Sequence, residues 1–542
     1  MGPIKKTLAK VNLKMSIKSS AMLLAGSGLM SSVLGLIRDR QLNGLYYSTY
    51  PRGIDAYTVA FIVPDFVFFI LVSGALSVSF IPVFNQRLAD GNKKSAWELS
   101  TSILNLMALA AFIASILIII FAEPLVRYVV GPGLDESGRA LAVSMMRVIA
   151  INPFLFSIAT VISSMQQAVG RFTFFALAPT VYNIGIIIGS TFFTGGINLF
   201  GWQLFEGGIM GVALGVVLGS IMQLVVSCVG LWGMGFDYRF KIYWKNKGFR
   251  KVLSLLPARS LNQGINYING IVETNMASRM AAGSIRAYNQ ASNLSQVPTN
   301  LIGVAISTAV FPKMAERLGQ GRPDLFKKEL QTTLRVIVWL SLPVTIVTFF
   351  GRGYLIGFIK NGGDVLMAST LGVLAVSILF GSIYQIAARS FYAHQDTKTP
   401  LYISFFTIGL NIALAVWFTL GLNLGVYGLA LAFSIVSVVQ VGLLMYIMAR
   451  RIKGLFDGPF VHALARMVGA TLVMSVVTYT SFIMLPLKAT DLSFLASFPK
   501  FLLIVAISLS SYFVVSWMLK LSETKPVIKY LKKLLFGSVG RS

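Results

Sequence analysis

The chain has 542 residues, of which 56% are hydrophobic and only 12% are charged. No class of soluble globular protein has this composition, whereas many long apolar runs are typical of a polytopic membrane protein. The formal net charge is +27, but the basic residues cluster between apolar runs. They therefore indicate membrane topology rather than binding to nucleic acid.

The sequence lacks the residue patterns that are typical of metal and redox sites. Cys228 is the one cysteine, which excludes a disulfide within the chain. The two histidines, His394 and His462, lie far apart, and no metal-ligand spacing occurs. No nucleophile–base pair stands out either. We expect no cofactor, no metal and no enzymatic activity.

The N-terminus resembles a signal peptide, because several lysines precede an apolar run that starts near Ser20. Apolar runs continue to the end of the chain, so we interpret this segment as an uncleaved first membrane span. A helix needs about 20 apolar residues to cross a bilayer, and the sequence predicts about fourteen such helices in an all-α fold. The expected spans are 20–44, 55–85, 97–122, 140–168, 177–198, 206–234, 252–281, 286–316, 328–350, 365–391, 400–421, 425–449, 462–485 and 497–519.

Basic residues follow the even-numbered spans and are scarce after the odd-numbered ones. Because lysine and arginine are retained on the cytoplasmic side, this alternation predicts that both termini are cytoplasmic. We expect a multi-pass protein of the bacterial cytoplasmic membrane.

Ionisable residues occur within or beside the first two spans. Span one ends in Arg38, Asp39 and Arg40, and span two carries Asp55 and Asp65. Such groups are costly in a bilayer and are functional candidates by default. Three alternatives are open: Arg38 could extend its charge to the membrane surface, Asp39 could serve only to pair with a neighbouring arginine, and Asp55 could cap span two.

A polar stripe runs along span seven, residues 253–279. Its members recur every three or four residues, so they share one face of a helix. They are Arg259, Asn262, Gln263, Asn266, Asn269 and Glu273. Hydrocarbon cannot satisfy such a stripe. It serves either to join helices by hydrogen bonds or, as we favour, to line a polar cavity.

Span eight continues the polar pattern with Asn289 and Asn293, followed by Gln296 and Asn300. Arginine binds phosphate with two parallel hydrogen bonds, and amides suit sugars and peptides. The combined set of candidate side chains predicts a site for a large anionic head group.

The chain also repeats itself. Residues 74–91 resemble 304–321 at an offset of 230, and 208–223 resemble 425–440 at an offset of 217. Each repeat holds six spans, so the copies have the same orientation, and a substrate site is expected between them. The predicted domains are a lobe at 1–236, a basic linker at 237–251, a second lobe at 252–451, two extra helices at 452–520 and a basic tail at 521–542.

Three segments resemble the MurJ/MviN family of lipid II flippases in the MOP transporter superfamily. They are 31–82 (with SSVLGLIRD, DAYTVAFIVPDF and GALSVSFIP), 170–185 (GRFTFFALAPTVYNIG) and 389–400 (RSFYAHQDTKTP). The resemblance implies fourteen helices, a central cavity and alternating access. It implies as substrate undecaprenyl pyrophosphate carrying a glycopeptide, and a groove for the lipid tail in the last two helices.

Only some of the family's site residues are present at the matching positions of this chain. Arg38 and Asp55 match its essential arginine and aspartate. Where the family has arginines, this chain has Ser32, Phe68 and Asn293, and Ser73 replaces a glutamate. We hypothesise a rearranged pyrophosphate site centred on Arg38 and Arg259, with Arg147 as a weaker candidate.

Two other functions remain open on the sequence. One is export of another polyprenyl-pyrophosphate-linked oligosaccharide, or of a different cargo of the same superfamily. The other is a scaffold that recruits cell-wall synthesis proteins through the tail at 521–542. Membrane lipids are expected partners in every case.

Overall fold

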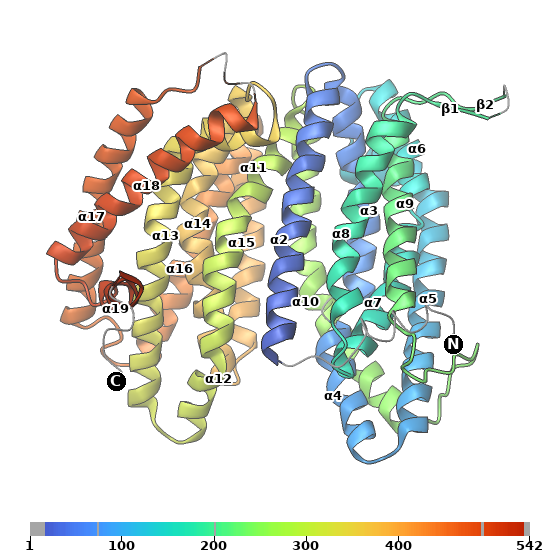
Figure 1. Ribbon diagram of the computed structural model, residues 1–542, viewed down its shortest axis with the longest axis horizontal. Helices are drawn as coiled ribbons and strands as arrows, with labels where there is room; N and C mark the ends of the chain where they lie inside the picture. Colours follow the sequence, from blue (N-terminus) through green and yellow to red (C-terminus); the bar gives the residue numbers. More distant parts are fainter. Residues whose placement is uncertain (1–16, 73–74, 200–201, 489–490, 492, 536–542) are drawn as a thin grey trace. The chain divides into compact units, whose positions relative to one another are not determined.

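The computed structural model describes residues 17–535 apart from 73–74, 200–201, 489–490 and 492. At some positions inside helices, among them 75–79 and 257–266, it describes the backbone but not the side chains. The described chain is helical almost throughout (Figure 1), and the predicted all-α membrane fold is confirmed. The exception is a short antiparallel hairpin of β1 (Ile197–Leu199) and β2 (Trp202–Phe205).

The chain forms two compact units, residues 1–286 and 287–542. The first holds α2 (Ile17–Leu42), α3 (Pro51–Leu71), α4 (Ala75–Ala89), α5 (Lys93–Pro124), α6 (Glu136–Ile149), α7 (Asn152–Ala168), α8 (Thr173–Ile188), β1, β2, α9 (Met210–Val229) and α10 (Lys247–Ser278). The boundary falls inside α11 (Ser284–Thr299). The second unit continues with α12 (Ala305–Gly319), α13 (Pro323–Ile359), α14 (Val365–Ala393), α15 (Lys398–Val416), α16 (Val426–Arg451), α17 (Gly458–Met484), α18 (Phe494–Met518) and α19 (Thr524–Leu535). Short π-helical turns follow α2, α5, α8, α11 and α15, at Asn43–Tyr47, Leu125–Val130, Gly189–Phe193, Asn300–Val304 and Trp417–Gly421.

Thirteen helices among the described residues are long and apolar enough to cross a membrane. They correspond to every predicted span except 252–281. That span lies in α10, which has 32 residues and carries the predicted polar stripe.

Several helices begin where a short polar side chain accepts a hydrogen bond from the first turn. This contact satisfies one of the amide groups that a helix start leaves unpaired. Such capping side chains begin α5, α6, α10, α14, α17 and α18; they are Asn92, Asp135, Asn246, Asp364, Asp457 and Ser493. The sequence thus marks helix starts that hydropathy alone places only roughly.

The second predicted span, 55–85, is two helices in the structure. The first, α3, ends at Leu71, and α4 begins at Ala75. The apolar run hides the break, since residues on both sides of it are apolar and only the short pair of Ser73 and Gly74 separates them.

In the first unit, α8 and α9 run side by side at backbone contact (Figure 1). A Cβ atom built on Gly185 would lie 2.2 Å from the Cα of Gly219, and one built on Gly189 would lie 2.3 Å from the Cα of Gly215. Only glycine permits this approach, a common device between membrane helices.

The second unit is built around α13, α14 and α16, which pack on one another. A core of buried side chains joins them, including Phe326, Leu330, Phe391 and Leu444. The two extra spans predicted at the C-terminus are α17 and α18, which pack together and against α13.

Candidate functional site

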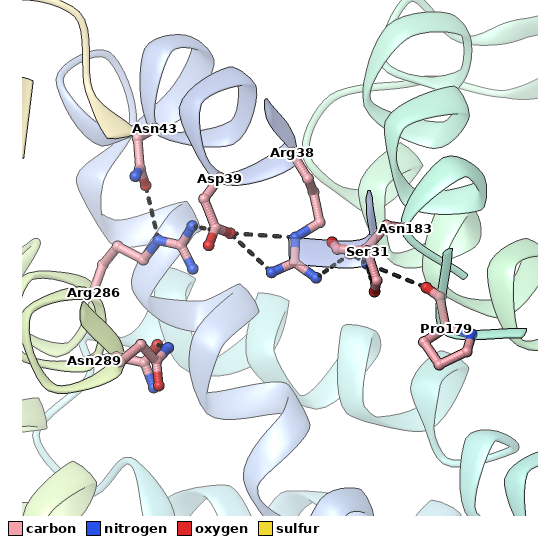
Figure 2. A network of polar contacts seen from close by, with 9 residues as sticks. Ser31, Arg38, Asp39, Asn43, Pro179, Asn183, Arg286 and Asn289 are labelled. Atoms are coloured by element: carbon pink, nitrogen blue, oxygen red, sulfur yellow. Dashed lines mark hydrogen bonds and ion pairs between the residues drawn. The ribbon is translucent and has the colours of Figure 1, made fainter. Parts of the chain in front are cut away.

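A charged cluster lies at the end of α2 in the first unit (Figure 2). The guanidinium of Arg38 donates to Oδ1 of Asp39 from Nη2 at 3.1 Å and from Nε at 3.3 Å. Arg286, in the first turn of α11, reaches the same oxygen from Nη2 at 3.3 Å. Nε of Arg286 also donates to Oδ1 of Asn43 at 2.9 Å. Two guanidinium groups therefore share one carboxylate.

The cluster is largely withdrawn from the surface. The side chain of Arg286 is 5% exposed, that of Asp39 15% and that of Arg38 25%. Electrostatic attraction is stronger in such a setting than in water, and an unpaired charge would be costly there. Asp39 therefore holds both arginines in place.

Asn183 of α8 fixes the other side of Arg38. Its side-chain oxygen accepts from Nη1 of Arg38 at 3.0 Å. Its amide nitrogen donates to the hydroxyl of Ser31 at 3.2 Å and to the carbonyl of Pro179 at 3.2 Å. Asn183, which is itself held by these two hydrogen bonds, thus positions the guanidinium of Arg38 between α2 and α8.

Asp55 supports the same cluster through the backbone. It is 3% exposed. Its carboxylate accepts the amide N–H of Gly283 at 2.6 Å and that of Arg286 at 2.8 Å. Gly283 has φ +91°, a conformation that favours glycine. The alternative that Asp55 caps its own helix is wrong, because it caps the start of α11 instead.

Asp65 occupies a different environment on α3. It is half-buried, and within the described part of the chain no hydrogen bond or salt bridge to its carboxylate occurs.

Three predicted residues of the span-seven stripe, Arg259, Asn262 and Asn266, lie on α10, but their side chains are outside the described residues. Glu273 is 9% exposed. It accepts from Nδ2 of Asn269, one turn earlier, at 2.8 Å. This pair is the part of the stripe whose geometry is known.

Asn289 and Asn293 lie one turn apart on α11, in the second unit. Nδ2 of Asn293 donates to Oδ1 of Asn289 at 3.0 Å. Asn293 is exposed and Asn289 half-buried. The weaker candidate Arg147 is outside the charged cluster, and its Nε donates to the carbonyl of Ile119 at 3.3 Å.

The sequence-based prediction did not include Arg286, Asn43 or Asn183 as site residues. A usable signal existed for two of them. Asn183 belongs to the quoted 170–185 motif, and Arg286 is a lone charge followed by no other charged residue before Lys313. Within the described ranges, no group of three histidine, cysteine, aspartate or glutamate side chains could hold a metal ion.

The arrangement offers two planar guanidinium groups held close together by a single carboxylate. An oxyanion with several acceptor oxygens can replace that carboxylate as the partner of both groups, because arginine binds phosphate with two parallel bonds. The cluster is therefore suited to a phosphate or pyrophosphate group.

Comparison with known proteins points in the same direction. The family model described as lipid II flippase MurJ matches residues 53–514. A probable lipid II flippase MurJ of Buchnera aphidicola subsp. Acyrthosiphon pisum is 27% identical over 460 residues, which cover 83% of this chain and 87% of that protein. The lipid II flippase MurJ of Burkholderia cenocepacia is 25% identical over 406 residues, covering 72% and 76%.

Solved structures share the fold. A lipid II flippase MurJ in an inward closed conformation superposes with a TM-score of 0.72 and 23% identity, covering 92% of this chain and 98% of that one. An inward-facing multidrug resistance MATE family transporter of the MOP superfamily gives a TM-score of 0.66 at 15% identity, covering 81% and 99%.

Proposed function

This chain belongs to the lipid II flippase MurJ family, and from this premise we propose that it carries lipid II across the bacterial cytoplasmic membrane. The substrate is an undecaprenyl pyrophosphate that bears a glycopeptide. It moves from the inner to the outer leaflet by alternating access of two lobes. The family match over residues 53–514 supports this assignment.

The observation that carries the site proposal is the pairing of Arg38 and Arg286 on Asp39. We assign the two guanidinium groups to the pyrophosphate of the substrate. Asp39 holds them in position while the site is empty. Arrival of the pyrophosphate replaces one carboxylate by two phosphate groups, which the two arginines bind with more hydrogen bonds.

Arg286 also accounts for the missing family arginines. This chain has Ser32, Phe68 and Asn293 where the family has arginine. Arg286 lies two helical turns before Asn293 on the same helix. Arg259 stays a predicted second contributor, together with Asn262, Asn266 and the other polar residues of spans seven and eight. The lobes, the lipid-tail groove at 452–520 and the cytoplasmic termini also remain predictions.

The test is replacement of a depleted lipid II flippase, scored by the lipid II that becomes accessible outside the cell. Arg286→Ala is expected to reduce accessible lipid II by about 10- to 100-fold, since a hydrogen bond to a charged group is worth about 1.5–3 kcal/mol. Arg286→Lys keeps the charge but loses the paired bonds, so an intermediate effect is expected.

Arg52→Ala is a matched control. Arg52 also begins a membrane helix and also pairs with a carboxylate, Asp135, at 2.8 Å, but its side chain is 60% exposed. Transport by the folded Arg286→Ala protein at the level of the Arg52→Ala protein would refute the site assignment. Loss of rescue on deletion of 521–542, with rescue retained by Arg286→Ala, would favour a scaffold instead.

A further inference from the structure

A non-helical segment, residues 231–246, joins α9 to α10. Together with Lys247, the first residue of α10, it is here called the strap. It is fastened to the first unit at its start. The guanidinium of Arg171 donates to the carbonyl groups of Trp232 at 2.9 Å and Gly233 at 2.8 Å. The strap is therefore a fixed structural element of this unit.

The strap then runs along α5, which satisfies its backbone. Nδ2 of Asn105 donates to the carbonyl groups of Arg239 at 2.9 Å and Lys241 at 3.0 Å. The hydroxyl of Ser102 accepts the amide N–H of Tyr243 at 2.8 Å. With its backbone polar groups bound to the helix in this way, the strap turns other side chains outward.

The inward and outward side chains differ in chemistry. Phe236 and Ile242 pack against the buried core of the unit. Phe240 is 92% exposed and Trp244 54% exposed, although both are large and apolar. Exposed aromatic side chains close together on one segment mark an interaction surface.

Basic residues alternate with these aromatic ones. Residues 231–251 contain six lysines and arginines and one acid, Asp237. Arg239 is paired with that acid at 3.0 Å. Lys241, Lys245 and Lys247 are exposed. The surface of the strap is therefore cationic.

The anchoring residues place the strap at the edge of the hydrocarbon layer. The helix that includes α5 runs for 38 residues, Lys93–Val130, or about 57 Å, whereas the hydrocarbon core is about 30 Å thick. Its apolar run begins at Ile103. Ser102 and Asn105, which hold the strap, lie on either side of that point.

We propose that the strap is a lipid anchor, which inserts Phe240 and Trp244 among the head groups of a bilayer surface rich in anionic phospholipid. Lys241, Lys245 and Lys247 bind the lipid phosphates. Aromatic side chains favour the head-group level, and basic residues beside them favour anionic lipid. This inference does not depend on the transported substrate.

The test uses a single reporter cysteine. Cys228, the native cysteine, is exposed and is replaced by serine; Phe240→Cys then carries an environment-sensitive fluorophore. The labelled protein is reconstituted in nanodiscs of phosphatidylcholine with 0 to 40% phosphatidylglycerol. The label is expected to move to a less polar environment as phosphatidylglycerol increases.

Replacement of Lys241, Lys245 and Lys247 by glutamine is expected to weaken this response. The phosphatidylglycerol content needed for the same shift of the label should rise about 5-fold for each lysine removed. The matched control replaces three exposed lysines of the second unit, Lys520, Lys525 and Lys529, and should leave the response unchanged. A label that stays in a water-like environment at every composition would overturn the proposal. A label that is in an apolar environment at every composition, with no dependence on phosphatidylglycerol content, would overturn it as well.

Discussion

Replacement of Asp55 by alanine should open the first turn of α11 while leaving the rest of the unit folded. The carboxylate accepts two buried amide groups, from Gly283 at 2.6 Å and from Arg286 at 2.8 Å. The alanine variant leaves both without this partner. A buried amide without a partner costs about 1–3 kcal/mol, and loss of a helix cap costs about 0.5–2 kcal/mol. The free energy of local opening should therefore fall by about 2–5 kcal/mol.

Amide hydrogen exchange of the peptide that contains residues 283–287 measures this opening directly. A loss of about 2–5 kcal/mol predicts exchange faster by about 30-fold to several thousand-fold. Because Arg286 belongs to the same turn, transport should fall as well.

Two controls separate this effect from general damage. Asp65→Asn changes a carboxyl group on the same helix and should leave exchange at 283–287 unchanged. Asp135→Ala removes the cap of α6, where Oδ1 accepts from the amide of Gly138 at 3.1 Å, and should speed exchange there alone. Unchanged exchange at 283–287 in Asp55→Ala would show that the carboxylate does not hold α11.

Three further outcomes follow from described contacts. Gly219→Ala would place a methyl group 2.5 Å from a carbonyl oxygen of α8, so a loss of about 1–3 kcal/mol in unfolding free energy is expected, seen as a lower Tm. Arg335 binds Glu523 through two bonds of 2.7 and 3.1 Å, and Glu523 is 5% exposed; Arg335→Ala should lower the Tm more than Glu523→Gln, because it leaves a buried carboxylate unpaired. Burial raises the pKa of Asp396, but the hydrogen bonds from its neighbours, including Arg451, outweigh burial and lower that pKa to about 2. The stabilisation by Asp396 is therefore present above about pH 4 and lost as pH falls towards 2, so the Tm difference between wild type and Asp396→Asn should shrink over that range and stay constant above it.

The sequence predicted most of the membrane helices, because hydropathy over 20 residues is a strong signal. It predicted helix ends less well where polar residues continue a helix beyond the bilayer. Residues 328–350 were the expected span, whereas α13 runs from Pro323 to Ile359. Its first turns carry several charged side chains, which hydropathy excludes and helix propensity allows.

The candidate site was predicted in part. Arg38 and Asp55 were identified from their cost in a membrane and from the family motif. Arg286 was missed because a lone arginine at the start of a span is ordinarily explained by contact with the membrane surface. Its partner Asp39 is 247 residues away in sequence, and a single sequence does not reveal such a pairing.

The glycine contacts between α8 and α9 limit how this unit can exchange material with the bilayer. With Gly185 against Gly219 and Gly189 against Gly215, the two backbones touch and leave no space for an acyl chain or a file of water. At these positions the pair of helices is closed. A lipid tail that enters this unit between helices would therefore have to do so at another pair of helices.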